Sequence, residues 1–82
     1  MGTIIVIKGI SIHLYFGDHN PPHVHAIYNE HEGLIRISDG ELFRGYLPKP
    51  QLREVQQWIE DQTTKEKLEK QFYKMNPELR RK

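Results

Sequence analysis

Apolar and polar residues alternate along the first half of the chain, a pattern that predicts half-buried strands. In residues 10–16 every second side chain, beginning with Ile10, is apolar, and the side chains between them are polar. Residues 23–28 are also rich in types that suit a strand, with Val24, Ala26 and Tyr28 on the predicted core face. Both segments therefore predict strands that bury one face.

These two strands are predicted to pair antiparallel across the loop between them. Side chains two residues apart share one face of a strand, about 6.5 Å apart, so His23 and His25 are expected to point outward together. The register we expect places His13 opposite His25 and Tyr15 opposite His23. It keeps both apolar sets on one face, whereas a slip by one residue would put them on opposite faces.

Further strands are predicted around this pair at residues 3–7, 34–38 and 41–47, and residues 3–7 form either a first strand or an extended lead-in to the strand at 10–16. Residues 29–33 are interpreted as the turn that precedes the strand at 34–38. Asp39-Gly40 separates the last two strands and is typical of a type I′ hairpin turn, because both residue types tolerate positive φ. The apolar run within residues 3–7 is continuous, which indicates burial on both faces of this segment or cover by a partner chain.

The second half of the chain changes to helical spacing after Pro48-Lys49-Pro50, because prolines end a sheet and suit the first turn of a helix. Apolar residues then recur on one helical face over residues 50–61 and again over 64–75. Thr63 and Glu66 have capping-box spacing, which predicts a second helix starting near Thr64. The apolar stripes are Leu52, Val55, Trp58 and Ile59 in the first helix, and Leu68, Phe72 and Met75 in the second.

Strands followed by helices predict an α+β fold. We expect one domain over residues 1–82, in which a small antiparallel sheet of three to five strands (about 3–47) is followed by two C-terminal helices packed on one face. The 82 residues contain no cysteine, which excludes disulfides, thiolate metal sites and a cysteine nucleophile.

Charge and hydropathy narrow the class of protein further. The net charge of +1 is nearly balanced, so nothing global favours nucleic acid or membrane. The chain has no apolar run of about 18 residues, and its N-terminal apolar segment is too short for a signal peptide. The expected location is the cytoplasm.

Three of the five histidines fall within seven residues around Pro21-Pro22, and this cluster carries the candidate chemistry. One hypothesis is a metal site in which His13, His23 and His25 hold a divalent transition metal such as zinc, since neutral imidazole is a good ligand for such metals. Water in an open coordination position would then be activated for hydrolysis. The expected fourth or neighbouring partner is one of Asp18, His19 and Glu30.

A second hypothesis is metal-free acid–base chemistry on RNA. Histidine titrates near neutral pH, so His23 and His25 would exchange protons with the substrate, and Tyr15 would donate or stack. Arg36 or Arg44 would clamp the phosphate. In either chemistry, Asp18 and His19 are expected binding residues at the loop edge of the histidine face.

Two further alternatives involve no chemistry. In one, the histidine face and the hairpin dock a partner protein, and the apolar run 4–7 supplies that interface or a homodimer. In the other, the prolines and histidines only fix a loop, with His19 or His23 bonding backbone carbonyls. The lysines of the second helix alternate with Glu66 and Glu69, which favours a solvated face over a nucleic-acid stripe.

The run Pro21-Pro22-His23-Val24-His25, after the aromatic strand Leu14-Tyr15-Phe16, resembles the bacterial domain family of unknown function DUF4160, as does a later tryptophan such as Trp58. The resemblance covers roughly residues 10–73 and marks His23 and His25 as motif positions. It implies an uncharacterised component of a toxin–antitoxin-like two-gene module that binds a small DUF2442-type protein. It implies no catalytic mechanism, so the histidine-dependent RNase-type hydrolase stays an alternative to partner binding.

Overall fold

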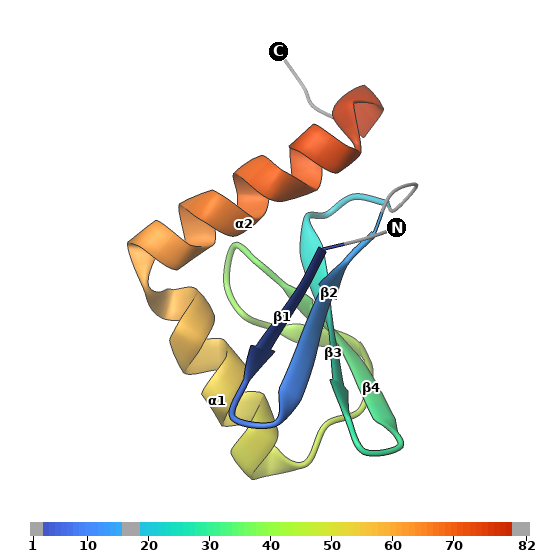
Figure 1. Ribbon diagram of the computed structural model, residues 1–82, viewed down its shortest axis with the longest axis vertical. Coiled ribbons are helices and arrows are strands. Elements are labelled where there is room, and N and C mark those ends of the chain that lie inside the picture. Colours follow the sequence, from blue (N-terminus) through green and yellow to red (C-terminus); the bar gives the residue numbers. More distant parts are fainter. Residues whose placement is uncertain (1–2, 16–18, 80–82) are drawn as a thin grey trace.

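The computed structural model describes residues 3–15 and 19–79, and it confirms the α+β fold as a five-stranded antiparallel sheet followed by two helices (Figure 1). The strands are β1 (Thr3–Ile7), β2 (Ile10–Leu14), β3 (His23–Tyr28), β4 (His31–Arg36) and β5 (Leu42–Gly45). They are followed by α1 (Lys49–Glu60), α2 (Gln62–Met75) and a short 3-10 turn, η1 (Pro77–Leu79).

The strands lie in the sheet in chain order, β1 to β5, so β1 and β5 are its two edges. Between β2 and β3, Ile12 lies opposite Ala26 and His13 opposite His25, which confirms the predicted pairing of His13 with His25. This register places Ile12 and Ala26 on one face, where both are buried.

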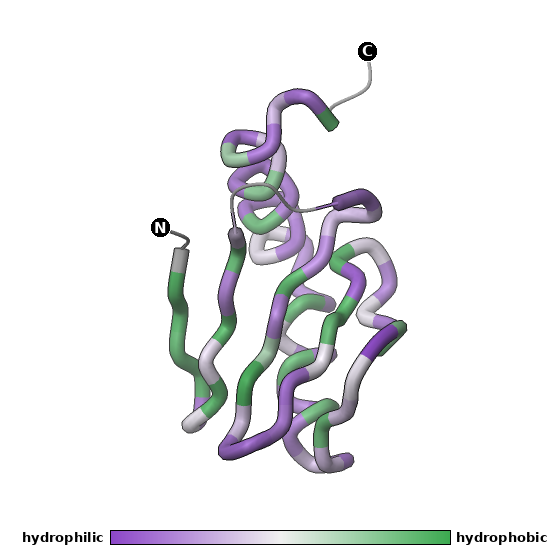
Figure 2. Tube along the Cα trace, turned by 90° about the vertical axis from the view of Figure 1, so that its right-hand side faces the viewer, coloured by the Kyte–Doolittle hydropathy of each residue, from purple (hydrophilic) through white to green (hydrophobic). Residues whose placement is uncertain are grey.

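Both helices pack on that same face and complete a single core. Most of the buried side chains come from every second residue of the inner strands and from the predicted helical stripes, because these positions face the sheet–helix interface, and Ile37 and Leu47 add to them from the segments after β4 and β5. The largest of them are Phe72, Ile10, Ile12, Leu14, Ile35, Ile37 and Ile59. Figure 2 looks onto the other face of the sheet, which the helices leave uncovered.

The turn between β3 and β4 is shorter than the predicted turn over 29–33. Tyr28 pairs directly with His31, and the loop of Asn29 and Glu30 closes because Asn29 adopts φ 55°. Gly33 lies inside β4, where a Cβ atom would come within 2.7 Å of Leu42 Cδ1. The glycine indicates this close packing rather than a turn, so β4 begins three residues earlier than predicted.

Asp39-Gly40 does form the β4–β5 connection, but the predicted type I′ turn is wrong. Gly40 has a positive φ of 75°, whereas Asp39 is not among the residues with positive φ. The Asp39 carboxylate instead accepts a hydrogen bond from the backbone N–H of Glu41 at 3.0 Å. The pairing also shifts register between Leu34 and Ile35, and β5 is correspondingly short.

The helices begin one or two residues before the predicted positions. α2 starts at Gln62 because Asp61 caps it, with Asp61 Oδ2 accepting from the backbone N–H of Thr64 at 3.0 Å. The predicted capping box at Thr63 is therefore wrong by two residues. No helix in the described chain is long and apolar enough to cross a membrane.

Candidate functional site

The uncovered face of the sheet brings together three of the predicted site residues, His13, Tyr15 and His25. We call it the open face, and it is formed by Ile4 and Val6 of β1, Ser11 and His13 of β2 with the adjoining Tyr15, His25 and Ile27 of β3, and Glu32 of β4. These side chains share a face because paired residues on adjacent strands point to the same side. The open face joins an apolar edge to a cluster of imidazole and phenol rings.

His23 departs from the prediction that both motif histidines point outward, because it is only 3% exposed. Its Nδ1 donates to the backbone carbonyl of Pro21 at 2.7 Å. Its ring packs edge-on against Phe43, at 5.4 Å between centroids, and lies 5.8 Å from Phe72 of the core. The loop-fixing role considered for this histidine therefore matches its position.

The end of α2 holds the chain on both sides of the motif loop. Asn76 is fully buried, and its side-chain amide donates to the carbonyl of Tyr15 at 3.0 Å. The Tyr73 hydroxyl donates to the side chain of Asn20 at 3.4 Å, and the amide of Asn20 donates to the carbonyl of Leu79 at 3.3 Å. Asn20 is joined to Pro21 by a cis peptide bond. The double-proline loop is thus anchored by residues more than fifty positions away.

His25 occupies a different environment on the open face. Its Nδ1 lies 3.1 Å from Glu32 Oε2, and its side chain is 14% exposed while that of Glu32 is 49% exposed. A carboxylate that accepts from Nδ1 fixes the tautomer and the orientation of the ring. The Tyr15 ring meets His25 edge-on at 4.6 Å. The sequence interpretation missed Glu32, because it assigned that residue to a turn.

The three predicted metal ligands do not form one cluster in the described chain, although the rings of His23 and His25 lie 5.0 Å apart between centroids. The Tyr15 ring stacks on His13 at 5.7 Å and also contacts His25, so a phenol lies against both imidazoles. Within residues 3–15 and 19–79, no three histidine or acidic side chains are close enough together to hold a metal ion. His19 and Glu30 are exposed, and Asp18 lies outside the described residues. Zinc binding stays a prediction.

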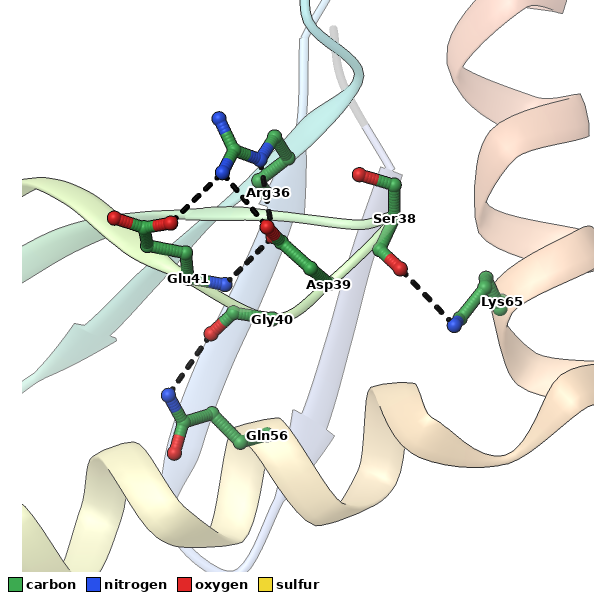
Figure 3. Close-up of polar contacts among 7 residues, drawn as sticks. All are labelled: Arg36, Ser38, Asp39, Gly40, Glu41, Gln56 and Lys65. Atoms are coloured by element: carbon green, nitrogen blue, oxygen red, sulfur yellow. Dashed lines mark hydrogen bonds and ion pairs between the residues drawn. The ribbon is translucent and has the colours of Figure 1, made fainter.

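The two predicted phosphate-binding arginines also differ in setting. Arg36 donates through Nε and Nη2 to Asp39, at 2.9 and 2.7 Å, and through Nη2 to Glu41 at 2.8 Å (Figure 3). The hydrogen bond from Arg36 lowers the pKa of Asp39 to about 2. The Arg36 guanidinium is thus engaged within its own hairpin, whereas Arg44 is exposed on β5 opposite Leu34.

Strand β1 is an exposed apolar edge and is not buried on both faces, which corrects one of the two sequence interpretations. Ile4 is 59% and Val6 is 64% exposed, although Ile5 and Ile7 pack against the core. β1 pairs with β2 on one side, and no strand of the described chain pairs with its other side. Figure 2 shows that most of this strand is hydrophobic.

Comparison with known families identifies the chain at the level of its domain. Comparisons with curated proteins and with solved structures found no match. The family model described as Domain of unknown function (DUF4160) matches residues 9–72, which span β2 to most of α2 and include the double-proline motif. The chain therefore belongs to the DUF4160 family.

Proposed function

We propose that this protein is a binding module that docks a partner protein through strand β1. The observation that supports it most strongly is the exposure of Ile4 and Val6 on a sheet edge with which no other described strand pairs. An edge strand offers a row of backbone donors and acceptors, and folded proteins usually protect such edges with charges, bulges or short length. Residues 3–7 carry no charge and no proline. An added strand would satisfy this backbone and cover the two side chains.

The opposite edge makes a weaker docking site. β5 has four residues, and its pairing with β4 contains a register shift. Gly45 adopts φ 80°, and the backbone N–H of Tyr46 donates to the carbonyl of Glu32 at 3.1 Å. A short, irregular edge is a poor template for strand addition. The contrast favours β1.

The family resemblance supplies the expected partner. We propose that the protein acts in a bacterial two-gene module of the toxin–antitoxin type, in the cytoplasm, and that the partner is a small protein of the DUF2442 type. The proposal needs no chemistry in this chain, so it is compatible with the burial of His23. β1 precedes the range matched by the family model, so the family match does not itself support the edge.

The experiment is co-expression with the product of the neighbouring gene, followed by affinity purification. Val6→Lys should abolish retention, because it places a charge in the middle of the apolar edge. Tyr46→Lys is the matched control, since Tyr46 follows β5 at the opposite edge of the sheet and is 58% exposed. Loss of the partner with Tyr46→Lys but not with Val6→Lys would contradict the β1 assignment.

One specific observation favours a second candidate, acid–base cleavage of RNA at His25. Glu32 orients its imidazole at 3.1 Å, and the Tyr15 ring borders it at 4.6 Å, whereas His23 is buried. A carboxylate that bonds one ring nitrogen holds the imidazole in a single orientation, which proton transfer to or from a substrate requires. Purified protein should then degrade RNA, and His25→Ala should remove the activity. A chelator arm tests the zinc prediction, because inhibition by chelator would require a metal.

A further inference from the structure

A groove of about 410 Å³ lies beside β1, between this strand and α2. Its apolar lining includes Ile5 of β1, Leu14 of β2 and Leu68 of α2. Leu14 and Leu68 are almost fully buried, so they form a well-packed base of the groove. The groove therefore continues the apolar edge of β1 onto the helix-covered side of the sheet.

Three lysines of α2, Lys67, Lys70 and Lys74, also line this groove. Their spacing places them on one side of the helix, since residues three or four apart share a face. No hydrogen bond or ion pair joins them to another side chain of the described chain. Lys65 differs, because its Nζ donates to the carbonyl of Ser38 at 3.1 Å (Figure 3). Lys67, Lys70 and Lys74, which we call the lysine row, therefore border the apolar lining of the groove, whereas Lys65 bonds the sheet side of the molecule.

We infer that the β1 edge and this groove together bind an extended, acidic segment of a partner protein. The inference rests on the proposed function and adds the chemistry of the ligand. A strand added to β1 would present alternate side chains to the two faces of the sheet. Side chains on one face would contact Ile4 and Val6, so apolar residues suit them. Side chains on the other face would lie over the groove, where carboxylates would meet the lysine row.

A second copy of this chain fits the same surface less well. If the β1 strands of two copies paired, the added strand would bring no carboxylate to the groove, because residues 3–7 contain no acidic residue. The lysine row of each copy would stay unneutralised, and the two rows would come closer together. Like charges brought together oppose association. The charge pattern therefore favours a different, acidic chain.

The experiment measures binding of fluorescein-labelled peptides by anisotropy. The probe is a capped peptide of about eight residues, a usual strand length, that alternates valine and glutamate. The control peptides replace every glutamate by glutamine or by lysine. The variant Lys67→Gln/Lys74→Gln is compared with Lys49→Gln/Arg53→Gln, which removes the same charge from exposed positions of α1.

The glutamate peptide should bind the unmodified protein about tenfold more tightly than the glutamine peptide, as expected for several exposed charge pairs. Lys67→Gln/Lys74→Gln should remove most of this preference, and Lys49→Gln/Arg53→Gln should keep it. Salt at about 1 M should also suppress the preference, because the screening length is then only about 3 Å. Val6→Lys should weaken all peptides that use the edge.

Several results would overturn the inference. Equal binding of the glutamate and glutamine peptides, or equal losses in the two double variants, would show that the lysine row is not a specific site. A dimer that Val6→Lys disrupts and the peptides do not displace would make a second copy the occupant. Tighter, Lys67-dependent and Lys74-dependent binding of a single-stranded RNA oligonucleotide would reassign the row to phosphates.

The same assay separates this inference from the proposed function. If no peptide binds while the partner still co-purifies in a Val6-dependent manner, the acidic-strand inference fails and the binding module stands. If neither peptide nor partner is retained, both fail.

Discussion

His23 and His25 belong to one short motif, yet the fold places them in different environments. His23 is buried, donates to Pro21 and packs against two phenylalanines. His25, two residues later on the same strand, lies on the open face beside Glu32. His23 is the first residue of β3, where the rings of Phe43 and Phe72 pack against it, so strand alternation alone does not set its exposure. A shared motif therefore does not imply a shared role.

The largest expected effect comes from alanine substitution at the two histidines. His23→Ala should lower the free energy of unfolding by about 2–4 kcal/mol, because it removes buried contacts and one hydrogen bond. That is a large share of the ~4–12 kcal/mol expected for a chain of this length. His25→Ala should cost less than about 1 kcal/mol, because its partner is half exposed. Urea unfolding followed by circular dichroism measures both.

His23→Asn provides the control for this comparison. Its side-chain amide offers a donor near the position of Nδ1, so part of the lost stability should return. Equal destabilisation by His23→Ala and His25→Ala would show that the difference in burial has no energetic consequence.

An intermediate effect is expected where α2 anchors the strand that leads to the motif. Asn76→Ala should lower the free energy of unfolding by about 1–3 kcal/mol, because it leaves the carbonyl of Tyr15 without this buried donor. Gln56→Ala is the matched control: Gln56 also donates to a backbone carbonyl, that of Gly40 at 2.9 Å, but from a half-buried position (Figure 3). A larger loss at Gln56 than at Asn76 would be the contrary result.

The smallest effect concerns the exposed Arg36–Asp39 pair at the connection between β4 and β5. The pKa of Asp39 falls from 3.8 to about 2 on folding, so the pair stabilises the protein above about pH 3.8 and this contribution is lost as the pH falls towards 2. Asp39→Asn should lower Tm slightly at pH 7 and not at all near pH 2. Thermal unfolding at the two pH values tests this, and a difference that grows in acid would contradict it.

Much of the fold could be predicted from local patterns. The alternation in residues 10–16 and 23–28 predicted the pairing of His13 with His25, because only one register keeps both apolar sets in the core. The turns were less predictable. Gly33 and Asp39-Gly40 are typical turn residues, but Gly33 lies in β4, where Leu42 packs against it, and Asp39 bonds Arg36 and Glu41.

The candidate site was predictable only in outline. The double-proline motif marked the region, and the open face does gather His13, Tyr15 and His25. Glu32 was missed because the predicted start of β4, at residue 34, was three residues too late. No local signal could reveal the hydrogen bond that Asn76 donates to the carbonyl of Tyr15, 61 positions away.

By itself the sequence determined the order of strands and helices, the register of the central pair and the apolar stripes of α1 and α2, because these follow from local side-chain periodicity. Only the tertiary structure decided that His23 is buried while His25 meets Glu32, that β1 is an exposed edge, and that three lysines border a groove beside it. These features depend on how distant segments pack, and the packing of distant segments leaves no periodic trace in the chain.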